Sequence, residues 1–260
     1  MKKLLTILLA LASCLGASAQ KSDVFNFGIG LNLGTNGVGL DASIGLTRFI
    51  QLRGGVSYVP KLKLNADVNV YNEVYHVAGL DLPGVPKEVP VKIQPNMTTY
   101  HALLDFYPAG SFHFTVGAYF GQERVVELYS NDGSLKPAAA ANTLIQGYNA
   151  LHSQDLDPIG VHIADNIFTP GSDGNLDAEM KVTKIRPYVG IGFGRAVPRH
   201  HRVGCSLDLG VQYWGKPEFL DHGMTPYTVE SNNNTEEMYS SISKLPVYPV
   251  VTFRICGRII

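Results

Sequence analysis

The sequence predicts an all-β fold, namely an eight-stranded antiparallel up-and-down transmembrane β-barrel with long extracellular loops. Three observations lead to this prediction. First, 27 glycines and 15 prolines among 260 residues argue against a helical bundle. Second, apolar residues recur at every second position in eight separate segments. Third, the connections between these segments are alternately short and long. The formal net charge of −1 also argues against nucleic acid as the main partner.

The N-terminus has the pattern of a secretory signal peptide. Two lysines and an apolar run precede Ala17-Ser18-Ala19, a small-residue cleavage site. We therefore expect 1–19 to be a signal peptide cleaved near Ala19, leaving 20–260 as one domain. An alternative is acylation at Cys14, because the residues before this cysteine also resemble a lipoprotein box.

Each of the eight segments alternates between two faces. The first runs from Phe25 to Leu33 with apolar residues at odd positions and Asn or Gly at even ones, and Asn36-Gly37 then favours a hairpin turn. The segments have roughly the 9–11 residues of a tilted strand that crosses a bilayer. They are 25–33, 38–47, 50–58, 100–106, 112–120, 184–193, 203–213 and 247–255.

The second face of these strands distinguishes a membrane barrel from a secreted soluble β-barrel. A soluble barrel would place Lys, Glu and Thr on its water-facing side, whereas here this face carries mainly Gly, Ser, Asn and Thr. Such small residues suit the narrow lumen of an eight-stranded barrel. The long connections are 60–97, 122–180 and 215–245, which we predict to be extracellular, opposite short periplasmic turns.

These features carry a resemblance to a known class. Leu104-Asp105-Phe106-Tyr107-Pro108 followed by Phe112-His113-Phe114, and a terminal strand with Phe253, resemble small outer-membrane β-barrel proteins of Gram-negative bacteria, of the OmpA, OmpX and OmpW type. The resemblance implies location in the cell outer membrane, with outer-membrane lipid, lipopolysaccharide and the barrel assembly machinery as partners. It implies no nucleic acid, and it leaves any extracellular ligand unknown. The chain departs from the class at its end, Arg258-Ile259-Ile260, where an aromatic residue is usual.

Charged residues on the second face are predicted to fill the lumen. Because unpaired charge in a low-dielectric interior is costly, we expect them to form a paired, hydrogen-bonded plug rather than an open pore. The alternative is a narrow conduit for protons or ions. The predicted plug consists of Asp41, Arg53, Asp105, Lys184, Arg186, Asp208 and Arg254.

An enzymatic alternative rests on three residues near the predicted outer rim. His101 and Asp105 share one face of a strand, and Ser57 lies on the neighbouring strand, so nucleophile, base and orienting carboxylate are geometrically possible. This arrangement would suit an outer-membrane lipid-modifying enzyme. No sequence motif accompanies it, and a hydrogen-bonded lumen histidine is the commoner outcome.

The long loops carry the remaining signals. Residues 122–179 contain nine acidic and two basic residues, a net charge of −7, so the rest of the mature chain is +4. Within this loop the alternating oxygen ligands Asp173, Asn175, Asp177 and Glu179 resemble the start of a calcium loop without completing the EF-hand pattern. Calcium is thus the one cofactor considered, and a solvated turn is the alternative.

Three shorter segments give further predictions. Pro137 and the apolar residues that follow it up to Leu151 predict an amphipathic helix within the second long loop. Alternation continues over 61–71, which predicts a hairpin projecting beyond the membrane. Residues 195–202 are rich in Arg and His and are expected to form a solvated basic turn on the periplasmic side. We therefore expect a non-enzymatic barrel that presents surface loops for a structural or binding role.

Overall fold

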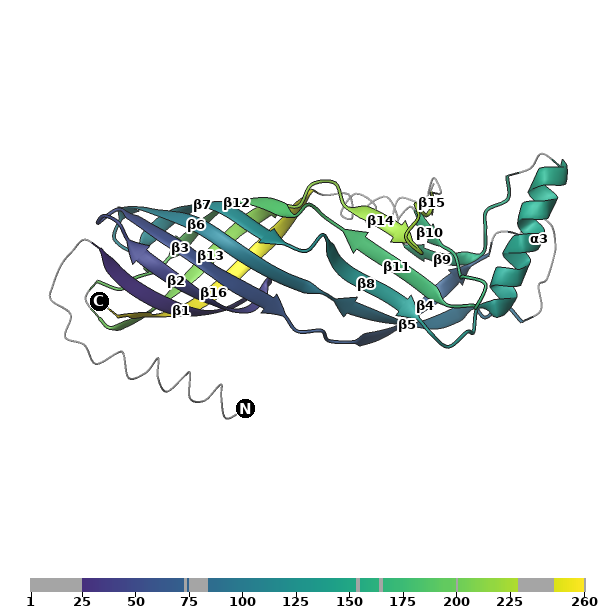
Figure 1. Cartoon of the computed structure of the whole chain (residues 1–260), viewed down its shortest axis with the longest axis horizontal. Helices are drawn as coiled ribbons and strands as arrows, with labels where there is room; N and C mark the ends of the chain where they lie inside the picture. Colours follow the sequence, from purple (N-terminus) through teal and green to yellow (C-terminus); the bar gives the residue numbers. More distant parts are fainter. Residues whose placement is uncertain are drawn as a thin grey trace.

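The computed structural model describes residues 25–72, 74, 84–152, 155–163, 166–199, 201–228 and 246–259. They form a closed barrel and, continuing from one of its ends, a second sheet with helix α3 at its far side (Figure 1). No helix among these residues is long and apolar enough to cross a membrane. The predicted signal peptide, with Ala19 and Cys14, lies outside the described residues.

The barrel has eight antiparallel strands in the order β1-β16-β13-β12-β7-β6-β3-β2. Each of the eight predicted segments is one of them, so this prediction is confirmed. The first and last strands close the barrel, with a register that runs from Gly28 opposite Arg258 to Gly34 opposite Thr252. The strands are β1 (Asn26–Gly34), β2 (Gly37–Gly45), β3 (Ile50–Val59), β6 (Met97–Ala109), β7 (Phe112–Gly121), β12 (Ile185–Phe193), β13 (Val203–Tyr213) and β16 (Val247–Arg258).

The barrel has two different ends. At one end lie the short connections β2–β3, β6–β7 and β12–β13 together with the C-terminus, and we call it the turn end. At the other, the loop end, the only short connection is the predicted Asn36-Gly37 turn. Gly37 has a φ of 90°, which L-residues with a side chain rarely adopt, and a Cβ there would overlap the backbone of Tyr58.

The three long connections contain strands and do not form irregular loops. They build one eight-stranded antiparallel sheet in the order β14-β11-β8-β5-β4-β9-β10-β15. The predicted projecting hairpin over 61–71 is its β4–β5 pair. The strands are β4 (Leu64–Tyr71), β5 (Glu88–Pro95), β8 (Arg124–Ser130), β9 (Gly160–Ile163), β10 (Asn166–Phe168), β11 (Leu176–Lys181), β14 (Glu218–Asp221) and β15 (Tyr227–Thr228).

We call this sheet together with helix α3 (Lys136–His152) the extension. The helix begins beside Pro137, as the sequence predicts, and it packs within the extension. Its Ala138, Ala141 and Ile145 are buried in the same apolar core as Val89 and Val91 of β5. The extension therefore has an interior of its own.

A layer of apolar side chains joins the extension to the loop end of the barrel. Met97, Val125, Val182 and Trp214 are buried there together. Only Asn96 separates β5 from β6, so one nearly continuous ribbon passes from the extension into the barrel wall.

Candidate functional site

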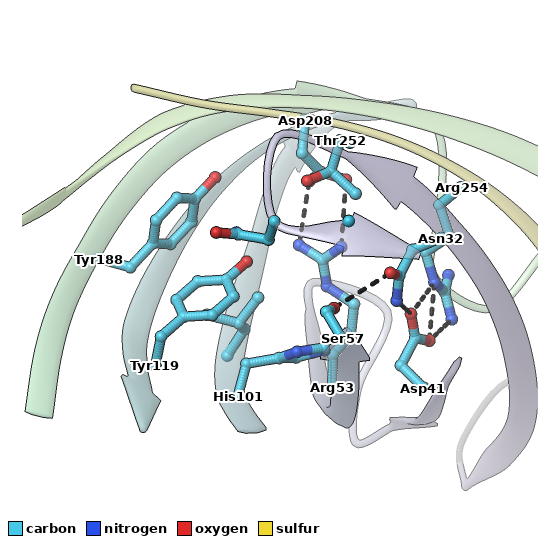
Figure 2. A pocket seen from close by; sticks show the side chains of 14 residues that line it. Asn32, Asp41, Arg53, Ser57, His101, Tyr119, Tyr188, Asp208, Thr252 and Arg254 are labelled. Atoms are coloured by element: carbon cyan, nitrogen blue, oxygen red, sulfur yellow. Dashed lines mark hydrogen bonds and ion pairs between the residues drawn. The ribbon is translucent and has the colours of Figure 1, made fainter. Parts of the chain in front are cut away.

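The barrel lumen contains an ion-pair cluster centred on Arg53. Its guanidinium lies between two carboxylates, because Nε is 2.8 Å from Oδ2 of Asp105 and Nη2 is 2.9 Å from Oδ1 of Asp208. Figure 2 shows the pair with Asp208. Thr115 donates a hydrogen bond to Asp105 (2.8 Å), and Nε2 of His113 lies 2.8 Å from Oδ1 of Asp208. These side chains come from β3, β6, β7 and β13, so the cluster ties opposite walls of the barrel together.

A second cluster is centred on Arg254 of β16. This guanidinium has no exposed surface and donates from Nε to both oxygens of Asp41, at 2.7 and 2.8 Å. It also bonds Ser43 (2.6 Å), and Asn32 donates to Asp41 (3.1 Å) (Figure 2). Asn32 in turn accepts a hydrogen bond from Ser57 (3.2 Å).

Close packing around these clusters explains the small residues of the second face. A Cβ at Gly30 would overlap the Arg254 guanidinium, and one at Gly192 would overlap the imidazole of His113. Glycine at these positions makes room for the large charged side chains opposite.

The turn end of the lumen is closed by the β12–β13 connection, which folds back into the barrel. Ala196 and Val197 are 1% and 0% exposed. Val197 exchanges two hydrogen bonds with the side chain of Gln51, and the Ala196 amide donates to the hydroxyl of Tyr107 (3.0 Å). The Ala196 carbonyl accepts from Arg254 (2.8 Å). The expectation of a wholly solvated basic turn is therefore wrong for the apolar centre of this segment.

The loop end of the lumen is closed by aromatic and amide side chains. Trp214 stacks on Tyr248 at 4.2 Å between ring centroids and donates to Gln212 (3.0 Å). Gln212 donates to Asn36 (3.1 Å), which follows β1. Both ends of the barrel are thus covered by side chains that are bonded to its wall.

Between these closures the lumen retains one small cavity of about 20 Å³, lined by residues that include His101, Tyr119 and Tyr188 (Figure 2). A single water needs about 10–15 Å³. The cavity therefore has room for one or two waters, and for no larger molecule.

Two of the predicted plug residues do not join the two clusters: Lys184 lies outside the lumen, and Arg186 faces inward at its loop end. Lys184 precedes β12, its side chain is 70% exposed, and it is 3.4 Å from Glu123, so its assignment to the lumen is wrong. The strand begins one residue later, and the alternation of inward and outward faces does not extend to Lys184. Arg186 is buried at the loop end, where it donates to the backbone carbonyls of Thr183 and Gln122 and lies over the Trp214 ring. The structure brings together the other five: Asp41, Arg53, Asp105, Asp208 and Arg254.

The three catalytic candidates are engaged with other residues. Asp105 bonds Arg53 and Thr115, while the Ser57 hydroxyl donates to Asn32. Nδ1 of His101 is buried without a hydrogen-bond partner among the described residues, and the ring packs against Tyr119 at 5.3 Å. Among the described residues, the Ser57 hydroxyl thus bonds Asn32 and not the imidazole of His101.

The calcium candidates lie at the start of β11, in the extension. Asp173 accepts hydrogen bonds from the backbone and side-chain amides of Asn175, at 3.1 and 2.6 Å, and these bonds lower the pKa of the Asp173 carboxyl. Glu179 is paired with Arg124 at 3.0 Å, and Asp177 is exposed on the same strand. Within the described ranges, no three His, Cys, Asp or Glu side chains are grouped as a metal site requires.

The barrel exterior is apolar and uncovered. Outward-facing side chains at mid-strand, such as Leu40 (58%) and Val189 (56%), are largely exposed. Aromatic side chains occur near strand ends, where Tyr100 lies opposite Phe120, and Phe112 lies opposite Phe193. Cys205 is exposed on this surface and Cys256 is buried, and both are free thiols.

The sequence analysis missed the groups that close the lumen. Tyr107 and Gln51 at the turn end, and Trp214 at the loop end, carry no motif. One signal was present, since Ala196-Val197-Pro198 is an apolar triplet inside an otherwise basic turn. His200 of this turn lies outside the described residues.

A closed eight-stranded antiparallel barrel with an apolar exterior and a polar, filled lumen defines the class of small outer-membrane β-barrel proteins. The solved structures that match include two of CarO from Acinetobacter baumannii, one of them named CarO2. They are 13% and 14% identical, with TM-scores of 0.47 and 0.45, covering 92% and 91% of this chain and 100% of each of those chains. No protein-family model matches the sequence, and no curated protein matches it significantly.

Proposed function

We propose that the protein is a non-conducting, non-enzymatic anchor in the outer membrane whose barrel holds the extension at the cell surface for binding or envelope structure. The observation that carries this proposal is the contrast between an exposed apolar exterior and a lumen filled by ion-paired side chains around a cavity of about 20 Å³. The apolar exterior needs contact with lipid, and the filled lumen leaves no path for ions or solutes.

The lipid environment follows from the cost of the exterior in water. Each large apolar side chain loses about 1.5–3 kcal/mol when it is exposed instead of buried. The barrel presents many on every strand, among them Leu31, Leu40, Phe114, Val189 and Val211, at 41–61% exposure. Placing this surface in hydrocarbon removes the cost, and barrel closure leaves no unpaired strand edge in the lipid. The lipid at the outer half of the barrel would be lipopolysaccharide.

The filled lumen argues against both a conduit and an enzyme. Arg53 is held by carboxylates on two sides, and Arg254 is held by both oxygens of one carboxylate. Neither guanidinium is therefore free to exchange its partner for a passing ion. Opening a path would also require removing Val197 at one end and Trp214 at the other.

The extension is the part suited to meeting a partner. It has a buried core, and the second of its three connections carries the net charge of −7 of residues 122–179. Because the short turns of such barrels lie on the periplasmic side, the extension with its acidic connection would face the cell exterior. A ligand there would meet a folded surface, because the three connections pair with one another.

Cysteine labelling in intact cells tests the placement. In a background with Cys205→Ser and Cys256→Ser, we compare Leu144→Cys, at an α3 side chain that is 71% exposed, with Arg48→Cys, in the exposed β2–β3 turn. A membrane-impermeant maleimide should label Leu144→Cys at once, and Arg48→Cys only after permeabilisation. The opposite pattern, or equal labelling of both, would refute the proposed topology.

Two measurements on purified protein test barrel closure and conduction. A closed barrel resists SDS until it is boiled, so unboiled protein should migrate faster than the boiled sample. In planar bilayers we expect no unitary conductance steps above those of bilayers that received boiled protein. Regular steps would refute the non-conducting assignment and favour the narrow conduit.

A further inference from the structure

A groove lies beside the β12–β13 turn, at the turn end of the barrel. We call it the rim groove; it has a volume of about 850 Å³, within the range of small-molecule sites. Outward-facing strand side chains form one wall, and the turns that carry arginines form the other. Its lining includes Phe193, Leu207 and Phe253 on the first wall and Arg48, Arg195 and Arg199 on the second.

Among the described residues, the arginine wall has no counter-charge. None of the side chains that line the groove is acidic, and no ion pair among the described residues involves Arg48, Arg195 or Arg199. Burial, and then the positive charge of Arg199, lower the pKa of Arg195. Two like charges thus lie near each other, and a bound anion would relieve their repulsion.

Two of these arginines, Arg195 and Arg199, are also held in place. Arg195 donates from Nε and Nη2 to the Gly110 carbonyl, at 3.1 and 2.8 Å, and its guanidinium lies 4.4 Å from the centroid of the Tyr107 ring. Arg199 donates to the carbonyl of Arg48. Because they are already ordered, little side-chain entropy is lost when an anion binds.

The opposite wall is continuous with the apolar exterior. Phe193 is 69% exposed, and Leu207 and Phe253 are each 45% exposed. A ligand that fills the groove must therefore be anionic at one end and apolar at the other. A soluble anion would leave this wall in contact with water.

We propose that the rim groove binds an anionic phospholipid of the periplasmic leaflet, with its phosphate between the arginines and its acyl chains along Phe193, Leu207 and Phe253. The proposal rests on the proposed function, since that function places the turn end at the periplasmic membrane interface. Soluble phosphates share the headgroup chemistry, and the test separates them from the lipid.

Native mass spectrometry of the detergent-purified mature protein measures this binding, with phosphatidylglycerol and phosphatidylcholine compared. We expect one phosphatidylglycerol per chain to be retained in preference to phosphatidylcholine. Arg48→Gln with Arg199→Gln should weaken retention roughly 25-fold, since each basic group near a lipid surface contributes about fivefold. The matched control, Arg124→Gln with Lys136→Gln, removes the same charge from the extension and should change nothing. Millimolar glycerol phosphate should not displace the lipid.

Several outcomes would overturn the proposal: equal retention of both lipids, unchanged retention in the Arg48 and Arg199 variant, equal loss in the control variant, or displacement by glycerol phosphate. If the double variant does not fold, Arg48→Gln alone, in an exposed turn, should still give about a fivefold loss. Each preparation is first checked for heat-dependent gel mobility. Wild-type protein without a mobility shift refutes the membrane barrel itself, whereas a shift without lipid preference refutes only the groove.

Discussion

The apolar residues point outward in the barrel and inward in the extension. On β6 the apolar residues Tyr100 and Phe106 point outward, while His101 and Asp105 point inward. On β5, which is separated from β6 by a single residue, Val89 and Val91 are buried and Lys92 is exposed. The direction of the apolar face changes at Asn96. This difference fits the surroundings that we propose for the two parts, hydrocarbon around the barrel and water around the extension.

The largest expected difference between the two parts is the cost of breaking one ion pair in each of them. Arg53→Ala leaves Asp105 and Asp208 buried without their counter-ion and should cost about 3–5 kcal/mol in unfolding free energy. Arg124→Ala breaks the partly exposed pair with Glu179 in the extension and should cost less than about 1 kcal/mol. Urea unfolding of the barrel in lipid vesicles measures both. Equal costs would mean that the lumen is hydrated and not filled.

A matched pair of leucines sharpens the comparison directly. Leu40 on β2 and Leu64 on β4 have similar exposures, 58% and 56%. If Leu40 faces hydrocarbon, Leu40→Arg should destabilise the folded barrel by about 2–4 kcal/mol. Leu64→Arg, on a surface that faces water, should change stability by about 0.5 kcal/mol or less. Similar small effects at both positions, in the same vesicle experiment, would remove the case for lipid.

Asn142 tests whether the extension folds on its own core. Its side chain is buried and exchanges two hydrogen bonds with the backbone of Ile159, at 2.8 and 2.7 Å. Asn142→Ala should cost about 1–3 kcal/mol, confined to the extension. Hydrogen exchange should therefore accelerate in α3 and β9 and stay unchanged in β1 and β16. Acceleration in both parts would show that they unfold together.

Calcium should have the smallest effect. Asn175 already bonds Asp173, and Arg124 already bonds Glu179, so binding would have to displace both partners. We expect calorimetry with millimolar calcium to detect no binding heat. Saturable heat that disappears in Asp173→Asn would support the calcium-loop hypothesis.

The barrel strands could be predicted from sequence because lipid imposes one apolar face on each strand, and that requirement repeats every second residue. In the extension, only the alternating segment 61–71, which contains β4, could be predicted in this way. β9, β10, β14 and β15 have only two to four residues, too few for a periodic pattern, and they pair across different connections. The residues 122–180 therefore resembled a loop with one helix.

The lumen shows the same limit at the level of single residues. Alternation correctly predicts that Arg53 and Asp208 face inward, but Arg53 on β3 meets Asp208 on β13 across the barrel, and that pairing depends on strand tilt and stagger. The error at Lys184 arises where the strand ends, since a periodic pattern does not mark its own boundary. Closure by Ala196-Val197-Pro198 depends on a turn folding inward, which no strand pattern predicts.

The order of the extension strands has a consequence for how such a surface can evolve. The hairpin β4–β5 from the first connection occupies the centre, strands of the second connection lie on both sides of it, and strands of the third form both edges. Each connection is thus nested around the one before it in the chain. Exchange of a single connection between related proteins would remove partners from the other two, so these segments must diverge as a set. Inserted sequence is best accommodated at positions that take no part in strand pairing, such as the exposed side of helix α3.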